Sequence, residues 1–227
     1  MRIQTRWALA LCVAMAALLC GCMGLPGAGR IEKIESSAFD QPDKTRLGQR
    51  FLAAANAQEG KSGFQLVQAG VDGLLLRLQM ISAAERALDL QYFIFRADRT
   101  GRMLTQAVLQ AADRGVRVRL LIDDGDTEPG DEQLTSLTHH PRIEVRIFNP
   151  FSYRGNSKIL RGLEFAANLQ RLDYRMHNKL LVVDNALAMV GGRNIANEYF
   201  QIDPDFRFAD EDALAVGPIV RRLSASF

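Results

Sequence analysis

The side chains best suited to chemistry are concentrated between positions 177 and 194. His177 is followed by Lys179 and then by Asp184, and after a second apolar run come a glycine pair at 191–192 and Asn194. A neutral imidazole can attack phosphorus. In an extended segment, a lysine two residues later points to the same side, where its ammonium can neutralise a phosphate oxygen. The pattern therefore predicts a phosphate site with a histidine nucleophile.

Each of these residues also has a simpler interpretation. A single histidine is more often structural than catalytic, a single lysine is usually solvated, and two glycines usually form a turn. The joint spacing favours chemistry, because the side-chain N–H of Asn194 can donate to the same phosphate oxygens and residues 191–192 allow a close backbone approach. We expect Asp184, at the end of the first apolar strand, to order the loop and pair with a basic group rather than act on substrate.

Short apolar strands and amphipathic helices surround these residues. Strands are expected at 64–67, 87–95, 116–122, 143–148, 180–183, 187–190 and 213–216, and helices at 44–57, 71–88, 103–114, 131–137, 159–169 and 218–226. The central part alternates strand and helix, and such βαβ units build parallel sheets that helices cover. We therefore predict an α/β fold, an α-β-α sandwich around a mostly parallel sheet.

The motif resembles that of the phospholipase D superfamily. Its HKD motif is read here as His177, Lys179 and Asp184, followed by residues 191–192 and Asn194. The common family pattern has a serine after the first glycine, and this chain has a second glycine instead. That difference removes one hydroxyl donor from the site.

The likeness extends upstream and covers roughly residues 62–227. Segments 90–95 and 115–124 are similar to the first two strands of the cardiolipin synthase-like branch. The resemblance implies a phospholipase D-like fold that needs no metal and no other cofactor.

The resemblance also implies roles for individual residues. His177, Lys179 and Asp184 would form the catalytic motif, with His177 as nucleophile or general acid. Lys179, Asn194 and Gly192 would bind the substrate phosphate. A carboxylate further along the chain orients the histidine in this family. By position before the last strand, Asp210 is the first choice, and the fallbacks are Glu211 and Asp212.

Superfamily active sites use two HKD motifs, and this sequence contains one. The end of the chain just inside an apparent helix favours the N-terminal half of a two-motif enzyme over a natural single-motif homodimer. The expected function is phosphatidyl transfer on phospholipids through a phosphohistidine intermediate, as in cardiolipin synthases. The alternatives are phospholipase D hydrolysis, a superfamily phosphodiesterase or nuclease, and an inactive half that only binds phosphate groups.

The first residues predict export and lipid attachment. Residues 7–19 form an apolar run behind two arginines, too short to span a bilayer comfortably, and Leu19-Cys20-Gly21-Cys22 resembles a bacterial lipobox. An ordinary signal cleaved nearby or an uncleaved anchor are the alternatives. We expect a lipoprotein signal peptide over 1–21, lipidation of Cys22, a flexible tether over 22–42 and one phospholipase D-like domain over 43–227. This places the protein in the bacterial cell envelope, anchored to a membrane and facing the periplasm, with the outer membrane slightly favoured.

The charge balance gives no support to a nucleic-acid partner. Removal of residues 1–21 takes away two arginines and no acid, so the 28 basic and 26 acidic side chains of the whole chain become 26 and 26. Proteins that bind duplexes usually carry a basic surplus. The resemblance and the lipobox imply a phospholipid substrate and a membrane as partners.

Overall fold

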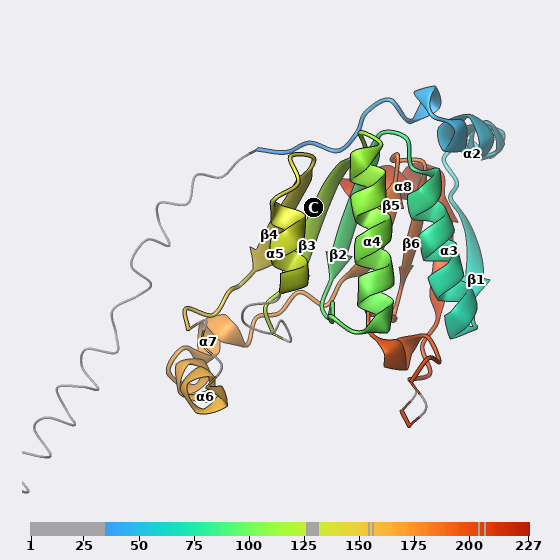
Figure 1. Ribbon diagram of the computed structural model, residues 1–227. Helices are drawn as coiled ribbons and strands as arrows, with labels where there is room; N and C mark the ends of the chain where they lie inside the picture. The colour runs from blue at the N-terminus through green and yellow to red at the C-terminus, as the bar shows by residue number, and fades with distance from the viewer. Residues whose placement is uncertain (1–34, 126–131, 154, 156, 204, 207) are drawn as a thin grey trace, which may run out of the picture.

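One seven-stranded sheet organises the chain. The computed structural model describes residues 35–125, 132–153, 155, 157–203, 205–206 and 208–227. The strand order is β1-β7-β6-β5-β2-β3-β4 (Figure 1). The strands are β1 (Gly63–Val67), β2 (Ala87–Tyr92), β3 (Arg117–Asp123), β4 (Ile143–Phe148), β5 (Lys179–Val183), β6 (Leu187–Gly191) and β7 (Asp212–Val216).

The α/β class is confirmed, but the prediction of a mostly parallel sheet is wrong. Among the described strands, only the pairings of β2 with β3 and of β3 with β4 are parallel. The other four pairings, β1 with β7, β7 with β6, β6 with β5 and β5 with β2, are antiparallel. The segments that join β2 to β3 and β3 to β4 contain the helices Arg99–Asp113 and Glu132–Thr138, so these strands can pair in parallel. The turn at Asp184 and Asn185 is too short for a crossover and closes β5 and β6 into a hairpin.

Helices cover both faces of the sheet unequally. The helices are α2 (Arg46–Asn56), α3 (Gly70–Ala83), α4 (Arg99–Asp113), α5 (Glu132–Thr138), α6 (Lys158–Ala167), α7 (Leu169–Leu172) and α8 (Pro218–Ser224), with 3₁₀ turns η1 (Pro42–Lys44) and η2 (Asn197–Tyr199). The helices α3, α4 and α5 lie on one face, where they bury the main core, and α8 lies on the other (Figure 1).

The alternation of β2 shows how the two faces differ. Leu88 and Leu90 point into the main core, whereas Asp89, between them, points to the face of α8. There its carboxylate forms a buried bidentate ion pair with Arg119, at 2.7 Å for both contacts. The Ser224 hydroxyl donates to the same carboxylate. The second face is therefore held by a buried polar network as well as by a small apolar cluster.

The folded body begins before the boundary expected at residue 43. Residues 35–41 form no helix or strand, yet they already contact the sheet. Arg119 donates to the Ser36 hydroxyl at 3.1 Å, and the Asn185 amide donates to the carbonyl of Phe39 at 2.7 Å. The part of the expected tether that precedes residue 35, the signal peptide and Cys22 lie outside the described residues.

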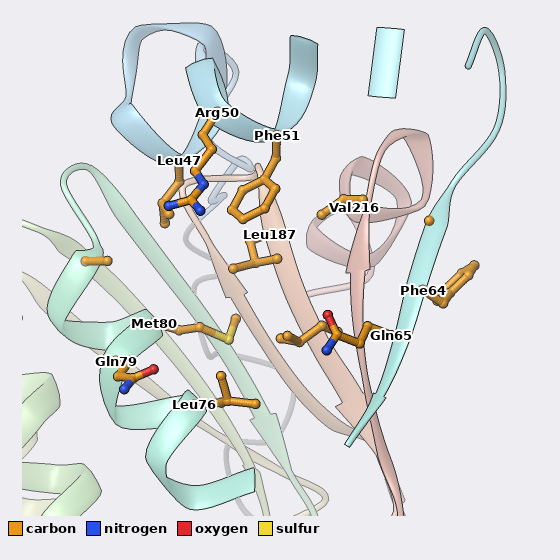
Figure 2. Close-up of a pocket in the computed structure, with 13 residues that line it drawn as sticks. Leu47, Arg50, Phe51, Phe64, Gln65, Leu76, Gln79, Met80, Leu187 and Val216 are labelled. Carbon is orange, nitrogen blue, oxygen red and sulfur yellow. The ribbon is translucent and has the colours of Figure 1, made fainter. Parts of the chain in front are cut away.

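An apolar cavity of about 710 Å³ opens between α2, α3 and the β1 end of the sheet (Figure 2). Phe51, Met80, Leu187 and Val216 are among the residues that line it. Leu187 begins β6 and Val216 ends β7, so the cavity lies at the opposite end of the strands from Gly191 and Asp212. It is therefore remote from the residues that the motif brings together.

Candidate active site

His177 and Lys179 share one aromatic ring. The imidazole of His177 stacks on Phe93 with ring centroids 4.3 Å apart, and the Lys179 ammonium lies 5.2 Å from the centroid of the same ring. Lys179 also donates to the carbonyl oxygen of His177 at 2.8 Å. The His177 side chain is exposed to solvent, and Lys179 is half-buried. The predicted nucleophile and the predicted phosphate ligand thus lie together, with the imidazole of His177 open to an incoming group.

The backbone around His177 is fixed on both sides. The carboxylate of Asp123, which ends β3, accepts a hydrogen bond from the N–H of Met176 at 2.8 Å. The N–H of Phe93 donates to the carbonyl of Asn178 at 3.1 Å. These bonds join the segment to the carboxyl ends of β2 and β3, so His177 is held at the edge of the sheet where ligands of α/β proteins commonly bind.

Lys179 is electrostatically perturbed. Partial burial lowers the pKa of Lys179, and the negative charge of Asp210 partly offsets that effect by raising it. The lysine therefore has a reduced solvent shell and a nearby counter-charge. An anion bound beside it would gain more than beside a fully solvated lysine, because both charges would be partly desolvated.

Asp210 is the predicted orienting carboxylate that the structure brings into this cluster. Its charge raises the pKa of Tyr199 in addition to the effect of partial burial, and it acts on Lys179 as well. An added Cβ at Gly192 would lie 2.1 Å from Oδ1 of Asp210, so the two residues are in direct contact. Its contact with the imidazole of His177 stays a prediction.

The two fallback carboxylates lie elsewhere. Asp212 is fully buried and accepts two hydrogen bonds from Arg77, at 2.8 and 3.0 Å, and one from Arg193 at 3.1 Å. Glu211 is exposed and its carboxylate accepts a hydrogen bond from Gln68. Both carboxylates therefore have structural partners away from the imidazole.

Gly192 occupies a different role from the one predicted. Its N–H donates to the carbonyl of Glu211 at 2.9 Å, between the end of β6 and the start of β7, so it is already engaged. The phosphate contact expected of this residue is therefore not available to its N–H in this arrangement. What the absence of a side chain provides is room for the carboxylate of Asp210.

Asn194 is buried and joins two parts of the site. Its Oδ1 accepts from the N–H of Ile94 at 3.0 Å, and its Nδ2 donates to the hydroxyl of Tyr199 at 3.0 Å. The amide thus orders the segment after β2, and a direct phosphate bond would use the second N–H of Nδ2. The assignment of Asn194 as a phosphate ligand stays a prediction.

Asp184 lies at the opposite end of β5 from His177. Its carboxylate is fully buried and accepts hydrogen bonds from the N–H groups of Glu85, Arg86 and Ala87 at 3.0, 2.7 and 2.9 Å. It therefore fixes the start of β2, as a loop-ordering residue would. Two expectations need correction: Asp184 does not join the catalytic cluster, and its carboxylate accepts from backbone amides where a basic partner was expected.

The two other histidines of the chain are also remote from the site. His139 and His140 lie in the turn that precedes β4, at the end of that strand opposite to the carboxyl edge. The Nδ1 of His140 accepts from the N–H of Arg142 at 3.1 Å, and its Nε2 lies 3.4 Å from Asp113. Neither histidine can therefore serve the His177 site of the same chain as a second catalytic imidazole.

Two site residues were not predicted from the sequence. Phe93 was expected inside a strand over 87–95, but β2 ends at Tyr92 and Phe93 turns onto His177. Tyr199 lies in η2 and reaches the site through Asn194. Its signal, a tyrosine five residues after the asparagine, is too weak to be recognised without the fold.

In the described part of the chain, no group of three or more His, Cys, Asp and Glu side chains is placed to hold a metal ion. Among the same residues, no helix combines the length and the apolar character needed to cross a membrane.

Comparison with known proteins places the chain in a family. The family described as "Cardiolipin synthase, PLD-like domain" matches residues 78–227. Cardiolipin synthase C of Escherichia coli is 42% identical over 182 residues, which cover 80% of this chain and 38% of that protein. Major cardiolipin synthase ClsA of Bacillus subtilis is 32% identical over 139 residues, which cover 61% of this chain and 26% of that protein.

The fold has a relative among solved structures. NucT from Helicobacter pylori superposes with a TM-score of 0.51 at 17% sequence identity, over 73% of this chain and 91% of that one. The chain spans about two fifths or less of the length of the two cardiolipin synthases that it matches. From its HKD motif, its sheet and these relatives, the chain belongs to the phospholipase D superfamily, in the cardiolipin synthase-like branch.

Proposed function

We propose that this chain supplies one catalytic motif for phosphatidyl transfer on phospholipids, with His177 as the nucleophile. The observation that carries the proposal is the pairing of the exposed imidazole with the Lys179 ammonium on the ring of Phe93. The similarity to proteins named cardiolipin synthases supports a phospholipid as the substrate class.

The chemistry follows from those positions. A ring nitrogen of His177 attacks the phosphorus of a phosphatidyl group, and an N–P bond forms while the P–O bond to the leaving alcohol breaks. A general acid gives its proton to the leaving oxygen. Lys179 neutralises charge on the phosphate oxygens, and Asp210 orients the imidazole and stabilises its positive charge. In the second half, the hydroxyl of another lipid attacks the phosphorus and passes its proton to the conjugate base of the general acid, while the N–P bond breaks and releases His177.

The general acid is a second histidine in this proposal. His139 and His140 lie at the other end of β4 and cannot fill that role within the same copy. We therefore assign it to a second HKD motif, supplied by the remainder of a longer two-motif protein or by a partner copy. The part of its relatives that this chain spans is compatible with one half of such an enzyme.

The cellular setting completes the proposal. A lipid on Cys22 and a linker before residue 35 would hold the domain at a membrane of the bacterial cell envelope, facing the periplasm, with the outer membrane slightly favoured. The substrate would then be a phospholipid of the same membrane.

The test separates transfer from its alternatives. Phosphatidylglycerol labelled with ³²P is mixed with the full chain, alone and together with a longer protein that supplies a second motif. One aliquot is denatured in alkali, where phosphohistidine survives, and the lipids of a second aliquot are extracted at neutral pH. Label on His177 and formation of labelled cardiolipin are expected. Phosphatidic acid as the sole product would show water as the acceptor, and so hydrolysis in place of transfer.

Matched histidine variants make the test specific. His177→Ala should abolish both label and product, whereas His140→Ala, at the remote turn, should leave them unchanged. Unchanged turnover of His177→Ala would overturn the assignment of the nucleophile. Absence of label and turnover in every combination would identify a half that only binds phosphate groups, and cleavage of nucleic acid in place of phospholipid would identify a nuclease.

A further inference from the structure

The helix α6 presents its apolar side to solvent. Ile159, Leu160 and Leu163 are 76%, 48% and 62% exposed, and no residue of the helix is buried. At 100° per residue, these three side chains lie within one face of the helix, and Ala166 and Ala167 lie on the same face and are also exposed. Helices of globular proteins usually turn such a face inward.

The polar side of α6 is what attaches it to the body. The Glu164 carboxylate accepts hydrogen bonds from the N–H groups of Ser152 and Tyr153, at 2.7 and 2.8 Å. Arg161 donates to the carbonyl of Asp124 at 2.5 Å. Partial burial alone would raise the pKa of Glu164, but these two N–H groups and the charge of Arg171 outweigh it and the net shift is downward. The outward direction of the apolar face is therefore built in by specific contacts.

The exposed apolar surface continues from α6 toward His177. Leu169 in α7 is 52% exposed, and Tyr174, three residues before His177, is 73% exposed. Figure 1 shows α6 and α7 beyond the carboxyl ends of β3 and β4, at the same edge of the sheet as η2. The side chains of Ile159, Leu160, Leu163, Leu169 and Tyr174, which we call the α6 surface, thus lead to the catalytic motif.

This region also carries a positive surplus. Residues 149–179 contain six arginines and lysines and two acids, a net charge of +4, whereas the whole chain carries +2. Exposed apolar side chains with a local positive surplus are complementary to a bilayer that contains anionic lipids, because acyl chains accept the former and head groups attract the latter.

We propose that the α6 surface docks on an anionic phospholipid bilayer and brings lipid head groups to His177. The helix lies in the plane of the interface, with Ile159, Leu160 and Leu163 inserted among the acyl chains and Lys158 at the head groups. The biological purpose rests on the proposed function, but the docking itself needs no turnover and is tested separately.

The test measures hydrogen exchange of the full chain by mass spectrometry, with and without vesicles. A local readout is needed because a lipid anchor at Cys22 would hold every variant to the vesicle. With phosphatidylglycerol vesicles, amides of residues 158–172 should exchange about tenfold or more slowly than without vesicles. Neutral phosphatidylcholine vesicles should protect them clearly less.

Two double variants make the comparison specific. Ile159→Asp with Leu163→Asp should remove the protection over 158–172. Val71→Asp with Leu75→Asp should keep it, because these side chains are also exposed and four residues apart on a helix, but lie on α3 away from the α6 surface. Turnover of a short-chain, monomeric phospholipid by the longer protein should be the same in both double variants, which separates loss of docking from loss of catalysis.

Three outcomes would overturn the docking proposal. One is exchange over 158–172 that anionic vesicles do not slow, and another is equal slowing in the Ile159 and Leu163 double variant. The third is slowing that appears without vesicles and grows with protein concentration, which would make the α6 surface a contact between two copies of the chain.

Discussion

Gly192 and Asp210 lie so close that a Cβ on Gly192 would come within 2.1 Å of the carboxylate of Asp210. This contact explains why a glycine stands where the family pattern has a serine. Any side chain at position 192 would push the carboxylate away from the charge of Lys179, which it now partly stabilises. The glycine and the acid therefore act as one unit in the site.

Gly192→Ala should lower the rate of phosphohistidine formation by about 10²-fold or more, the scale of losing one well-placed electrostatic group. The rate of ³²P labelling of His177 in the two-motif enzyme is the measurement. Combined with Asp210→Asn, the substitution should add almost nothing, since the first change already displaces the carboxylate. Gly162→Ala in α6, where a Cβ would meet no atom within 4 Å, is the control. Multiplicative losses in the double variant would show that the two residues act independently.

Replacement of Lys179 by methionine should change how stability depends on pH. Partial burial lowers the pKa of Lys179 below its usual 10.5, so the unfolded chain binds that proton more tightly than the folded protein. Below both pKa values the wild-type protein carries the full penalty, and the penalty disappears as pH rises through the lowered value toward 10.5. The free energy of unfolding of the wild type relative to Lys179→Met should therefore increase as the pH rises through the lowered pKa toward 10.5.

Denaturant titrations at several pH values give the difference in free energy of unfolding between wild type and Lys179→Met. The contributions of the other titrating groups cancel in that difference. In an Asp210→Asn background the increase should begin at lower pH, because Asp210 raises the pKa of Lys179. A difference that is flat across this range, or that falls, would contradict the burial of the ammonium.

Asp212→Asn should destabilise the fold strongly without involving the chemistry. The change would leave the guanidinium groups of Arg77 and Arg193 buried without their shared counter-charge, and breaking a buried ion pair from one side costs about 3–5 kcal/mol. The midpoint of urea unfolding, at unchanged slope, measures the loss. Glu211→Gln, the exposed neighbour, should stay within about 0.5 kcal/mol of wild type. A loss below about 1 kcal/mol in Asp212→Asn would mean that water reaches the arginines.

Asp184→Ala should cost stability while sparing the reactivity of His177. Three N–H groups at the start of β2 would lose their acceptor, and one unsatisfied buried donor costs about 1–3 kcal/mol, so a total of at least about 3 kcal/mol is expected. Thermal unfolding measures the loss of stability. Labelling of His177, measured well below the melting temperature, measures its reactivity. Asp173→Ala, at an exposed site before the motif, is the control. Loss of labelling in a still folded Asp184→Ala protein would return this residue to the catalytic set.

The sequence predicted the elements well where periodicity decides them. The strand at 143–148 agrees residue for residue with β4, and the helix expected at 218–226 begins where α8 does, at Pro218. Strand order and direction could not be predicted. The pairing of β1 with β7 and the insertion of β5 beside β2 join segments far apart in the chain, and no local pattern encodes which edges meet.

The sequence predicted those features of the site that depend on residue spacing alone. His177 and Lys179 are two residues apart in an extended segment, so their side chains were expected on the same side of it. The structure places them there. The roles of Gly192 and Asp184 depend on which backbone groups approach them from other strands, and so on the sheet. The sequence ranked Asp210 above Asp212 by position alone, and the partner of Asp212, Arg77, reaches it from α3.

The place of β1 at the edge of the sheet has a consequence for folding. Its partner β7 is separated from it by most of the chain, so β1 stays without a partner until most of the chain is available for folding. During that interval Phe64 and Leu66, exposed even in the finished sheet, stand on an unpaired strand. Until β7 arrives, this strand is therefore a site for edge-to-edge aggregation.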